Sequence, residues 1–203
     1  MPRPDMSDHL VHFMSGPTWE GAFATLCAII SERRLLGSGR INRDGHVCVC
    51  FSEAPLPVVP QGPVNADAYS RYTPFGVLVD KRWLFARGGR PVIYQSEQEY
   101  AQLPEIMQWR HMRYEPDADP SVDFTWEREW RLRTDALPLT PNNAVIVLPN
   151  EGWEARLHDA FHNDQDWQVE AYVQILGRDI AEACREEFPW RVTCLGTPDP
   201  ARG

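Results

Sequence analysis

The alternation of apolar and polar positions predicts short β-strands along much of the chain. The stretch "DHLVHFM" indicates a first strand, and "HVCVCFSEAPL" indicates another that ends at Pro55. Because side chains alternate between the two faces of a strand, the second stretch has a mixed polar face and an apolar face. The first face carries His46, Cys48, Cys50 and Ser52, and the second carries Val47, Val49 and Phe51.

Further strands are expected in the middle and late parts of the chain. Residues 75–80 and 91–95 have strand character and lie on either side of a Gly88-Gly89 turn. The apolar run "NAVIVLP" is typical of a buried strand, and "RVTCLG" indicates a last one. Residues 55–71 are rich in Pro, Gly and Asn, which predicts a surface loop.

Helical spacing of apolar residues is clearest in "SGPTWEGAFATLCAIISERRLLGSG". Pro17 suits a first helical turn, and Gly37 and Gly39 supply an exit. Residues 97–114 are also expected to be helical, and "GWEARLHDAFHND" and "GRDIAEACREEF" predict the final helices. In the first helix the buried face is expected to consist of Phe23, Leu26, Cys27 and Ile30.

This mixture predicts an α+β fold with a mixed, mainly antiparallel sheet flanked by helices. The length of 203 residues with 43% hydrophobic content favours a single domain over residues 1–203. Its sheet core is expected at residues 10–150, followed by a C-terminal helical segment at 151–203. Eighteen prolines favour many short elements over long helices.

Charge and cysteine content narrow the classes of partner and compartment. A net charge of −9 excludes a general attraction to nucleic acid or to an anionic membrane. Five cysteines without the spacing of a disulfide framework, and no apolar secretory segment, predict a cytoplasmic protein. No run approaches the ~18 apolar residues of a membrane-spanning helix, so no membrane partner is expected.

The segment "DFTWEREWRL", residues 123–132, places two carboxylates among aromatic and basic residues. If it is extended, Glu127, Glu129 and Arg131 share one face, and Trp126, Arg128 and Trp130 share the other. Two carboxylates beside an arginine are suited to acid/base chemistry or to stabilising an oxocarbenium ion. The alternative is an exposed, charged strand face with no chemical role.

Other residues suggest different chemistry. His158 and His162 share a helix face, and Cys48 and Cys50 share a strand face, although neither pair has the spacing of a known metal motif. A cysteine beside His46 is a second type of candidate, a nucleophile. The carboxylates of a metal-dependent nuclease or hydrolase would be Asp80, Glu97 and Glu129.

The order of these segments carries a resemblance to known families. The chain runs from "LVHFM" through "RRLLGSG", "VCVCFSEAPL" and "YTPFGVLVDKRWLFARGGRPVIY" to "EREWR". Over residues 10–132 this order resembles abortive-infection proteins of the AbiGi-like family. It is also similar to the ADP-ribosyltransferase fold of DarT-type toxins. The resemblance implies NAD as a substrate and a macromolecular acceptor.

The resemblance also implies roles for individual residues. His12, on the first strand, would bind the adenosine ribose of NAD. Ser52, with Tyr72 as an aromatic alternative, would hold the nicotinamide ribose and ring. In the Glu-x-Glu pair, Glu129 would be catalytic and Glu127 would position the acceptor. His12, Ser52 and Glu129 would then converge in one cleft.

Arginines would grip the pyrophosphate, because a guanidinium binds phosphate oxygens in a bidentate way. The candidates for this role are Arg87, Arg90 and Arg33. An acceptor made of nucleic acid would need a basic, aromatic strip. Such a strip is offered by Arg110, Arg113, Arg128, Arg131 and Arg133, interleaved with Trp109, Tyr114, Trp126 and Trp130.

Three functional hypotheses follow. The first is an ADP-ribosyltransferase that transfers ADP-ribose from NAD to a protein or nucleic acid, as a toxin or phage-defence effector. The second is a non-catalytic, antitoxin-like component that binds a cognate partner, with Glu127 and Glu129 as an acidic docking surface. The third is the metal-dependent nuclease or hydrolase.

Overall fold

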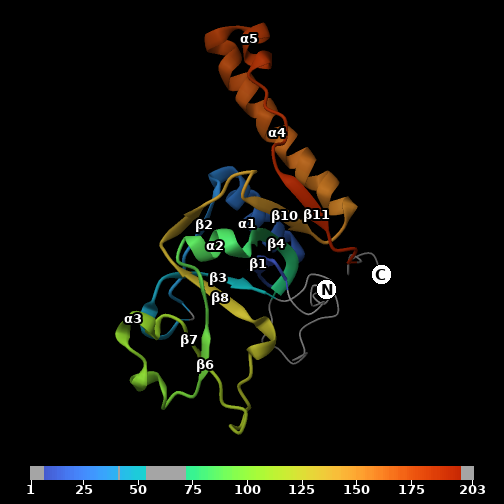
Figure 1. The fold of residues 1–203 in the computed structure, drawn as a ribbon. Helices are drawn as coiled ribbons and strands as arrows, with labels where there is room; N and C mark the ends of the chain where they lie inside the picture. Colours follow the sequence, from blue (N-terminus) through green and yellow to red (C-terminus); the bar gives the residue numbers. More distant parts are fainter. Residues whose placement is uncertain (1–6, 41, 54–71, 198–203) are drawn as a thin grey trace.

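A seven-stranded sheet forms the centre of the molecule (Figure 1). The computed structural model describes residues 7–40, 42–53 and 72–197. All neighbouring strands of this sheet are antiparallel except β10 and β11, which are parallel. The predicted α+β class with a mainly antiparallel sheet is therefore confirmed. In spatial order the strands are β11 (Arg191–Cys194), β10 (Ala144–Leu148), β4 (Tyr72–Asp80), β1 (His9–Ser15), β3 (Cys48–Ser52), β8 (Glu129–Arg133) and β5 (Arg90–Pro91).

Helix α1 (Trp19–Glu32) packs against one face of this sheet and closes the main core. It begins one residue after Thr18, whose side chain accepts a hydrogen bond from the N–H of Gly21. It ends earlier than the predicted glycine exit, because Arg33 adopts a left-handed conformation with φ 53°. The buried residues of α1 contact sheet residues that include Phe51, Phe75 and Val77.

Three short elements accompany the sheet. Strand β2 (Arg34–Leu36) pairs with β9 (Ala136–Pro138) just beyond α1. A 3-10 turn, η1 (Arg43–Gly45), precedes β3. Helix α2 (Lys81–Ala86), which the sequence did not predict, follows β4 directly, because Asp80 caps it by accepting a hydrogen bond from the N–H of Trp83.

The prediction of a helix over residues 97–114 is wrong. This region contains a 3-10 turn η3 (Tyr100–Gln102), one helical turn α3 (Glu105–Gln108) and strand β7 (His111–Arg113). Pro104 separates the two turns, since proline disfavours a helical conformation in the residue before it. Strand β7 then pairs in parallel with β6 (Ile93–Gln95), so long-range pairing overrides the local helical pattern.

The prediction of an extended segment over 124–132 is also wrong in its first half. Thr125–Glu127 form a 3-10 turn, η4, and Arg128 has φ 45°, so strand β8 begins only at Glu129. Glu127 and Glu129 therefore do not occupy alternate positions of one strand. Their relative placement depends on the turn at Arg128 and on the neighbours that hold it.

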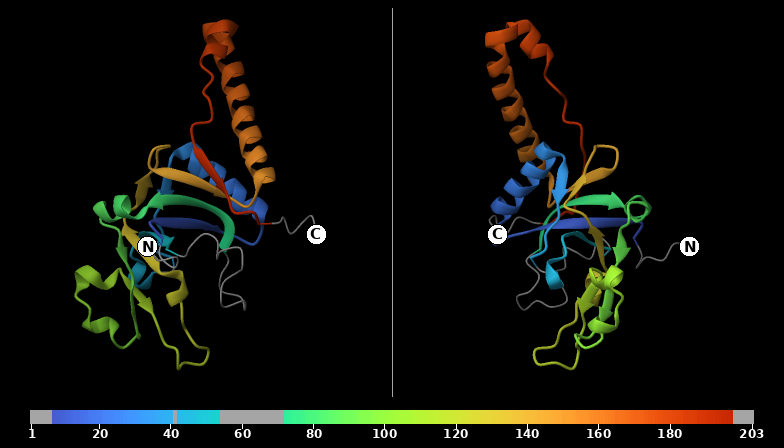
Figure 2. Two further views of the ribbon diagram at one scale, coloured as in Figure 1. Left: turned by 45° about the vertical axis from the view of Figure 1, so that its right-hand side comes forward. Right: turned by 90° about the vertical axis from the view of Figure 1, so that its left-hand side faces the viewer.

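The C-terminal segment forms an arm that projects from the sheet (Figures 1 and 2). Helix α4 (Glu151–Leu176) leads outward, α5 (Arg178–Ala183) turns the chain, and β11 brings it back to the sheet beside β10. Asn150 caps α4 by accepting hydrogen bonds from the N–H groups of Gly152 and Trp153. Within the ranges that the structure describes, no helix is both long and apolar enough to span a membrane.

Candidate functional site

Strand pairing places Glu129 on the face of the sheet opposite α1. Ser52 is paired with Glu129 of β8 and with Val11 of β1, so the side chains of these three residues lie on the same face. Cys50 is paired with Arg131 in the same way. Phe51 alternates with these residues and belongs to the core beneath α1. The predicted division of β3 into a polar and an apolar face is confirmed.

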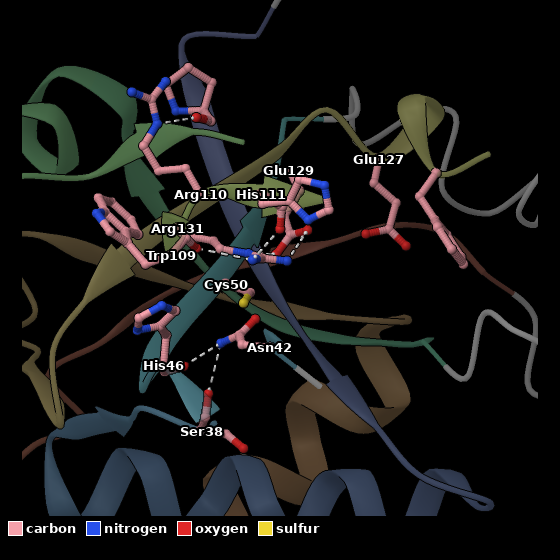
Figure 3. Close-up of polar contacts among 12 residues, drawn as sticks. Ser38, Asn42, His46, Cys50, Trp109, Arg110, His111, Glu127, Glu129 and Arg131 are labelled. Carbon is pink, nitrogen blue, oxygen red and sulfur yellow. Dashed lines mark hydrogen bonds and ion pairs between the residues drawn. The ribbon is translucent and has the colours of Figure 1, made fainter. Parts of the chain in front are cut away.

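Glu129 and Arg131 form a buried ion pair on this face (Figure 3). Arg131 donates to both oxygens of the Glu129 carboxylate, with N–O distances of 2.8 and 3.3 Å. Its Nη1 donates to the carbonyl oxygens of Trp109 and His111, at 3.1 and 2.9 Å. The side chains of Glu129 and Arg131 are 5% and 3% exposed, so the pair fastens the 109–111 segment to β8 with no free bonding capacity on the arginine Nη1.

Glu127 is the second carboxylate of this cluster, and it lies in a different environment from Glu129. Figure 3 shows it beside the Glu129–Arg131 pair, with no contact drawn to either residue. Its Oε2 accepts a hydrogen bond from the hydroxyl of Tyr72 at 3.3 Å, and no basic side chain of the described residues forms an ion pair with it. Burial, together with the nearby charge of Glu129, raises the pKa of Glu127 to about 7. Tyr72 is 41% exposed, so this pair of residues lies where the buried cluster meets solvent.

Two further hydrogen bonds hold the turn that carries Glu127. The hydroxyl of Ser52 donates to the carbonyl oxygen of Glu127 at 2.7 Å. The hydroxyl of Tyr94 donates to the carbonyl oxygen of Phe124 and accepts from the N–H of Glu129, at 3.2 and 3.1 Å. Sequence reasoning missed Tyr94, and no local signal identifies it, because it reaches Glu129 from a separate strand.

His12 does not join this cluster. Its Nδ1 donates to the carbonyl oxygen of Cys50 at 2.7 Å, and its ring contacts Phe51 with 5.8 Å between centroids. His12 pairs with Val77, a member of the core beneath α1, and therefore points to the opposite face from Ser52. Burial lowers the pKa of His12, which favours the neutral ring. The expected convergence of His12, Ser52 and Glu129 is not found.

The three arginines proposed for a pyrophosphate are engaged elsewhere. Arg87 stacks on the ring of Trp83 at 4.0 Å, outside the carboxylate cluster. Arg90 lies opposite Arg131 in the sheet, but its guanidinium covers the ring of Phe85 and donates to the carbonyl oxygens of Phe85 and Gly89. Arg33, at the end of α1, lies 3.7 Å from Glu186 in the C-terminal arm. The structure therefore brings Ser52, Tyr72, Glu127 and Glu129 together, and it leaves His12 and these arginines outside.

Nucleophilic chemistry at Cys48 or Cys50 is opposed by their surroundings. Burial raises the pKa of both thiols, and the nearby charge of Glu129 raises it further for Cys50. In Figure 3 no contact joins His46 to the sulfur of Cys50, and the carbonyl oxygen of His46 accepts a hydrogen bond from the side-chain amide of Asn42. The thiolate that a nucleophile requires is disfavoured at both positions.

The residues considered for a metal site are also dispersed. Asp80 caps α2, Glu97 forms an ion pair with Arg43, and Glu129 is held by Arg131. His158 packs on the ring of Phe188 at 4.6 Å between centroids. Among the described residues, no group of three or more His, Cys, Asp and Glu side chains is placed to hold a metal ion.

The arginines of the proposed nucleic-acid strip do not form one surface. Arg131 is 2% exposed, Arg113 is paired with Glu115, and Arg110 donates to the carbonyl oxygen of Pro91. The indole of Trp130 donates to Glu53, which also accepts from Lys81 at 2.7 Å, on the core side of β8. These residues stabilise the fold of the 90–131 region rather than presenting a row of cations.

No protein-family pattern, curated protein or solved structure matches this chain.

Proposed function

We propose that this chain is an ADP-ribosyltransferase that uses NAD as donor and a macromolecule as acceptor, with Glu127 as its reactive carboxylate. The observation that carries the proposal is the pair of unequal carboxylates at one end of β8. Glu129 is compensated by Arg131, whereas Glu127 forms no ion pair with the described residues and has a pKa of about 7. Carboxyl groups in such different environments are typical of sites where one group carries charge and the other moves a proton.

The transfer of ADP-ribose needs a negative charge near the ribose and a group that accepts a proton. Breaking the bond between C1′ of the ribose and the nicotinamide nitrogen sends the electron pair to that nitrogen, and neutral nicotinamide leaves. The sugar then has oxocarbenium character, which the negative charge of a nearby carboxylate stabilises. An oxygen or nitrogen of the acceptor forms the new bond to C1′, and its proton passes to Glu127. A general base with a pKa near the working pH suits this step.

The family resemblance assigns two residues that contact Glu127 to the reacting end of NAD. Ser52 and Tyr72 are the residues that the family resemblance assigns to the nicotinamide ribose and ring, and both contact Glu127. His12 was assigned to the adenosine ribose, away from the bond that breaks. We therefore retain Ser52 and Tyr72 as the residues that bind the nicotinamide ribose and ring. Proton transfer is assigned to Glu127 in place of Glu129. Glu129 and Arg131 fasten the start of β8 to the 109–111 segment, and Glu127 in its ionised form supplies the negative charge.

The test is release of nicotinamide from NAD in the presence of cell extract, with mass spectrometry to identify the modified acceptor. Glu127→Gln is expected to lower the rate by about 10²–10⁴-fold, the usual contribution of a general base. Glu105→Gln, an exposed change with the same loss of charge, serves as the matched control and should leave the rate unchanged. Nicotinamide release that persists in Glu127→Gln would overturn the role of Glu127. A wild-type protein that releases none would overturn the enzymatic proposal.

The second candidate, a non-catalytic component of a toxin or defence system, is favoured by a different observation. The C-terminal arm presents several large apolar side chains to solvent, among them Trp167 and Ile175, each 79% exposed. Exposed apolar surface of this kind marks an interaction site. If NAD is not turned over, binding through the arm remains as the function.

A further inference from the structure

The arm, defined as residues 160–187, carries a group of large exposed apolar side chains, which we call the apolar strip. Its large exposed residues lie on α4 and α5, whereas the residues between them, such as Val169 and Ala181, are buried where the two helices pack. A helix face in a monomeric protein is normally covered when it holds this many large apolar side chains. The apolar strip consists of Trp167, Tyr172, Ile175, Leu176 and Ile180.

A cavity lies at the base of the arm on the same side of α4. It has a volume of about 400 Å³ and is enclosed by α1, α4 and the returning chain at 186–190. Asp164 and Gln168 of α4 line it, and Ile175 follows Gln168 seven residues later, at helical spacing on the same face. Ile175 therefore lies on the cavity side of α4, whereas Trp167, directly before Gln168, lies about 100° further around the helix. The apolar part of the cavity wall is formed by Ile30, Leu157, Phe161, Phe188 and Trp190.

The charge around this surface selects the type of occupant. The arm contains seven Asp or Glu residues, two Arg and no Lys. Both arginines are already paired within the arm, Arg178 with Glu170 and Glu182, and Arg185 with Glu182 and Asp166. In the described part of the chain, no cation forms an ion pair with Asp164 at the cavity. The surface therefore presents apolar side chains within an acidic border.

This acidic border opposes two of the possible occupants. A second copy of the chain would bring two acidic arms within the ~8 Å over which charges interact at physiological ionic strength. An anionic membrane surface would be repelled for the same reason. A partner with basic residues beside apolar ones would gain from both contacts.

We propose that the arm is the docking site for a basic amphipathic helix of a partner protein. The apolar side of that helix covers the apolar strip, and one large side chain enters the cavity at its base. Its Lys or Arg residues face the acidic border, including Asp164 at the cavity, where Glu186 already forms an ion pair with Arg33. This is helix-in-groove recognition, in which anchors at helical spacing provide the affinity. The proposal is independent of whether the chain transfers ADP-ribose.

The experiment uses a fluorescein-labelled synthetic helix of Leu and Lys at helical spacing, and a matched helix with Glu in place of Lys. Fluorescence anisotropy with the full chain is expected to give micromolar binding of the Lys peptide and at least tenfold weaker binding of the Glu peptide. The double variant Trp167→Ala/Ile175→Ala should weaken the Lys peptide at least tenfold. It keeps the net charge, so general attraction between opposite charges is unchanged. Both residues are largely exposed, and circular dichroism will verify that the variant remains folded.

Ile106→Ala is the control, because Ile106 is 78% exposed on α3, far from the arm in Figure 1, and should leave binding unchanged. Equal binding of the two peptides, an unaffected double variant, or an equal loss in Ile106→Ala would overturn the proposal. Sedimentation velocity tests the second copy, since a dimer that the double variant dissociates would make another copy the occupant. Binding to phosphatidylglycerol vesicles that the double variant abolishes would make a membrane the occupant.

Discussion

Because Glu127 loses its proton near pH 7 in the folded protein, we expect the free energy of unfolding to fall as pH rises. The substitution Glu127→Gln should remove this part of the pH dependence. The pKa of this carboxyl is about 7 in the folded chain against an ordinary value of 4.5. Between these two values the folded state binds more protons than the unfolded state, so stability falls as pH rises. This difference in pKa lowers the free energy of unfolding by about 3 kcal/mol above pH 7. Below pH 4.5, where the carboxyl is protonated in both states, it has no effect.

Glu127→Gln removes the titration while keeping an oxygen that accepts the hydrogen bond from Tyr72. Relative to the wild type, this variant should gain about 3 kcal/mol of stability between pH 4.5 and pH 8. The measurement is urea unfolding followed by circular dichroism. Relative to the wild type, the urea midpoint of Glu127→Gln should rise by about 1 M or more between pH 4.5 and pH 8. Glu105→Gln, with the same change in net charge at an exposed position, reports the general effect of charge. Parallel pH profiles for the wild type and Glu127→Gln would refute a raised pKa of Glu127 in the folded protein.

Four further outcomes follow from the structure. Glu129→Gln should destabilise the protein by about 3–5 kcal/mol in the same urea assay, because it leaves the Arg131 charge buried without its partner. Tyr72→Phe should raise the pKa of Glu127, since the Tyr72 hydroxyl bond lowers it, and should therefore move the rise of nicotinamide release to higher pH. Trp153→Ala, at a residue that is 3% exposed and stacked against Phe75, should cost about 3–5 kcal/mol in thermal or urea unfolding. Asn150→Ala should cost about 1 kcal/mol through loss of the α4 cap.

Local sequence patterns predicted most of the sheet correctly. The alternation in "HVCVCFSEAPL" placed Phe51 and Ser52 on opposite faces, as β3 shows. The first, fourth, tenth and eleventh strands also lie where apolar runs indicated. These predictions succeeded because the period of two is a property of each strand by itself, and burial of one face follows from it. The predicted loop at 55–71 lies outside the described residues.

The predictions were wrong for two segments whose structure depends on contacts with distant parts of the chain. Residues 97–114 do not form the predicted helix, because Pro104 interrupts it and β7 pairs with β6. The extended form of 124–132 gave way to the turn at Arg128, which Ser52 and Tyr94 hold through hydrogen bonds from other strands. Local propensity is too small to decide such cases against several long-range hydrogen bonds.

The sequence by itself determined the α+β class, the faces of individual strands and the presence of a carboxylate pair near β8. Only the tertiary structure decided which carboxylate is compensated and which is not. Alternation relates side chains within one strand, but it does not relate His12 of β1 to Ser52 of β3, because their relation depends on strand register. The pairing Val11–Ser52 turned His12 toward α1, and the ion pair with Arg131 distinguishes Glu129 from Glu127, whose pKa is raised to about 7 by burial.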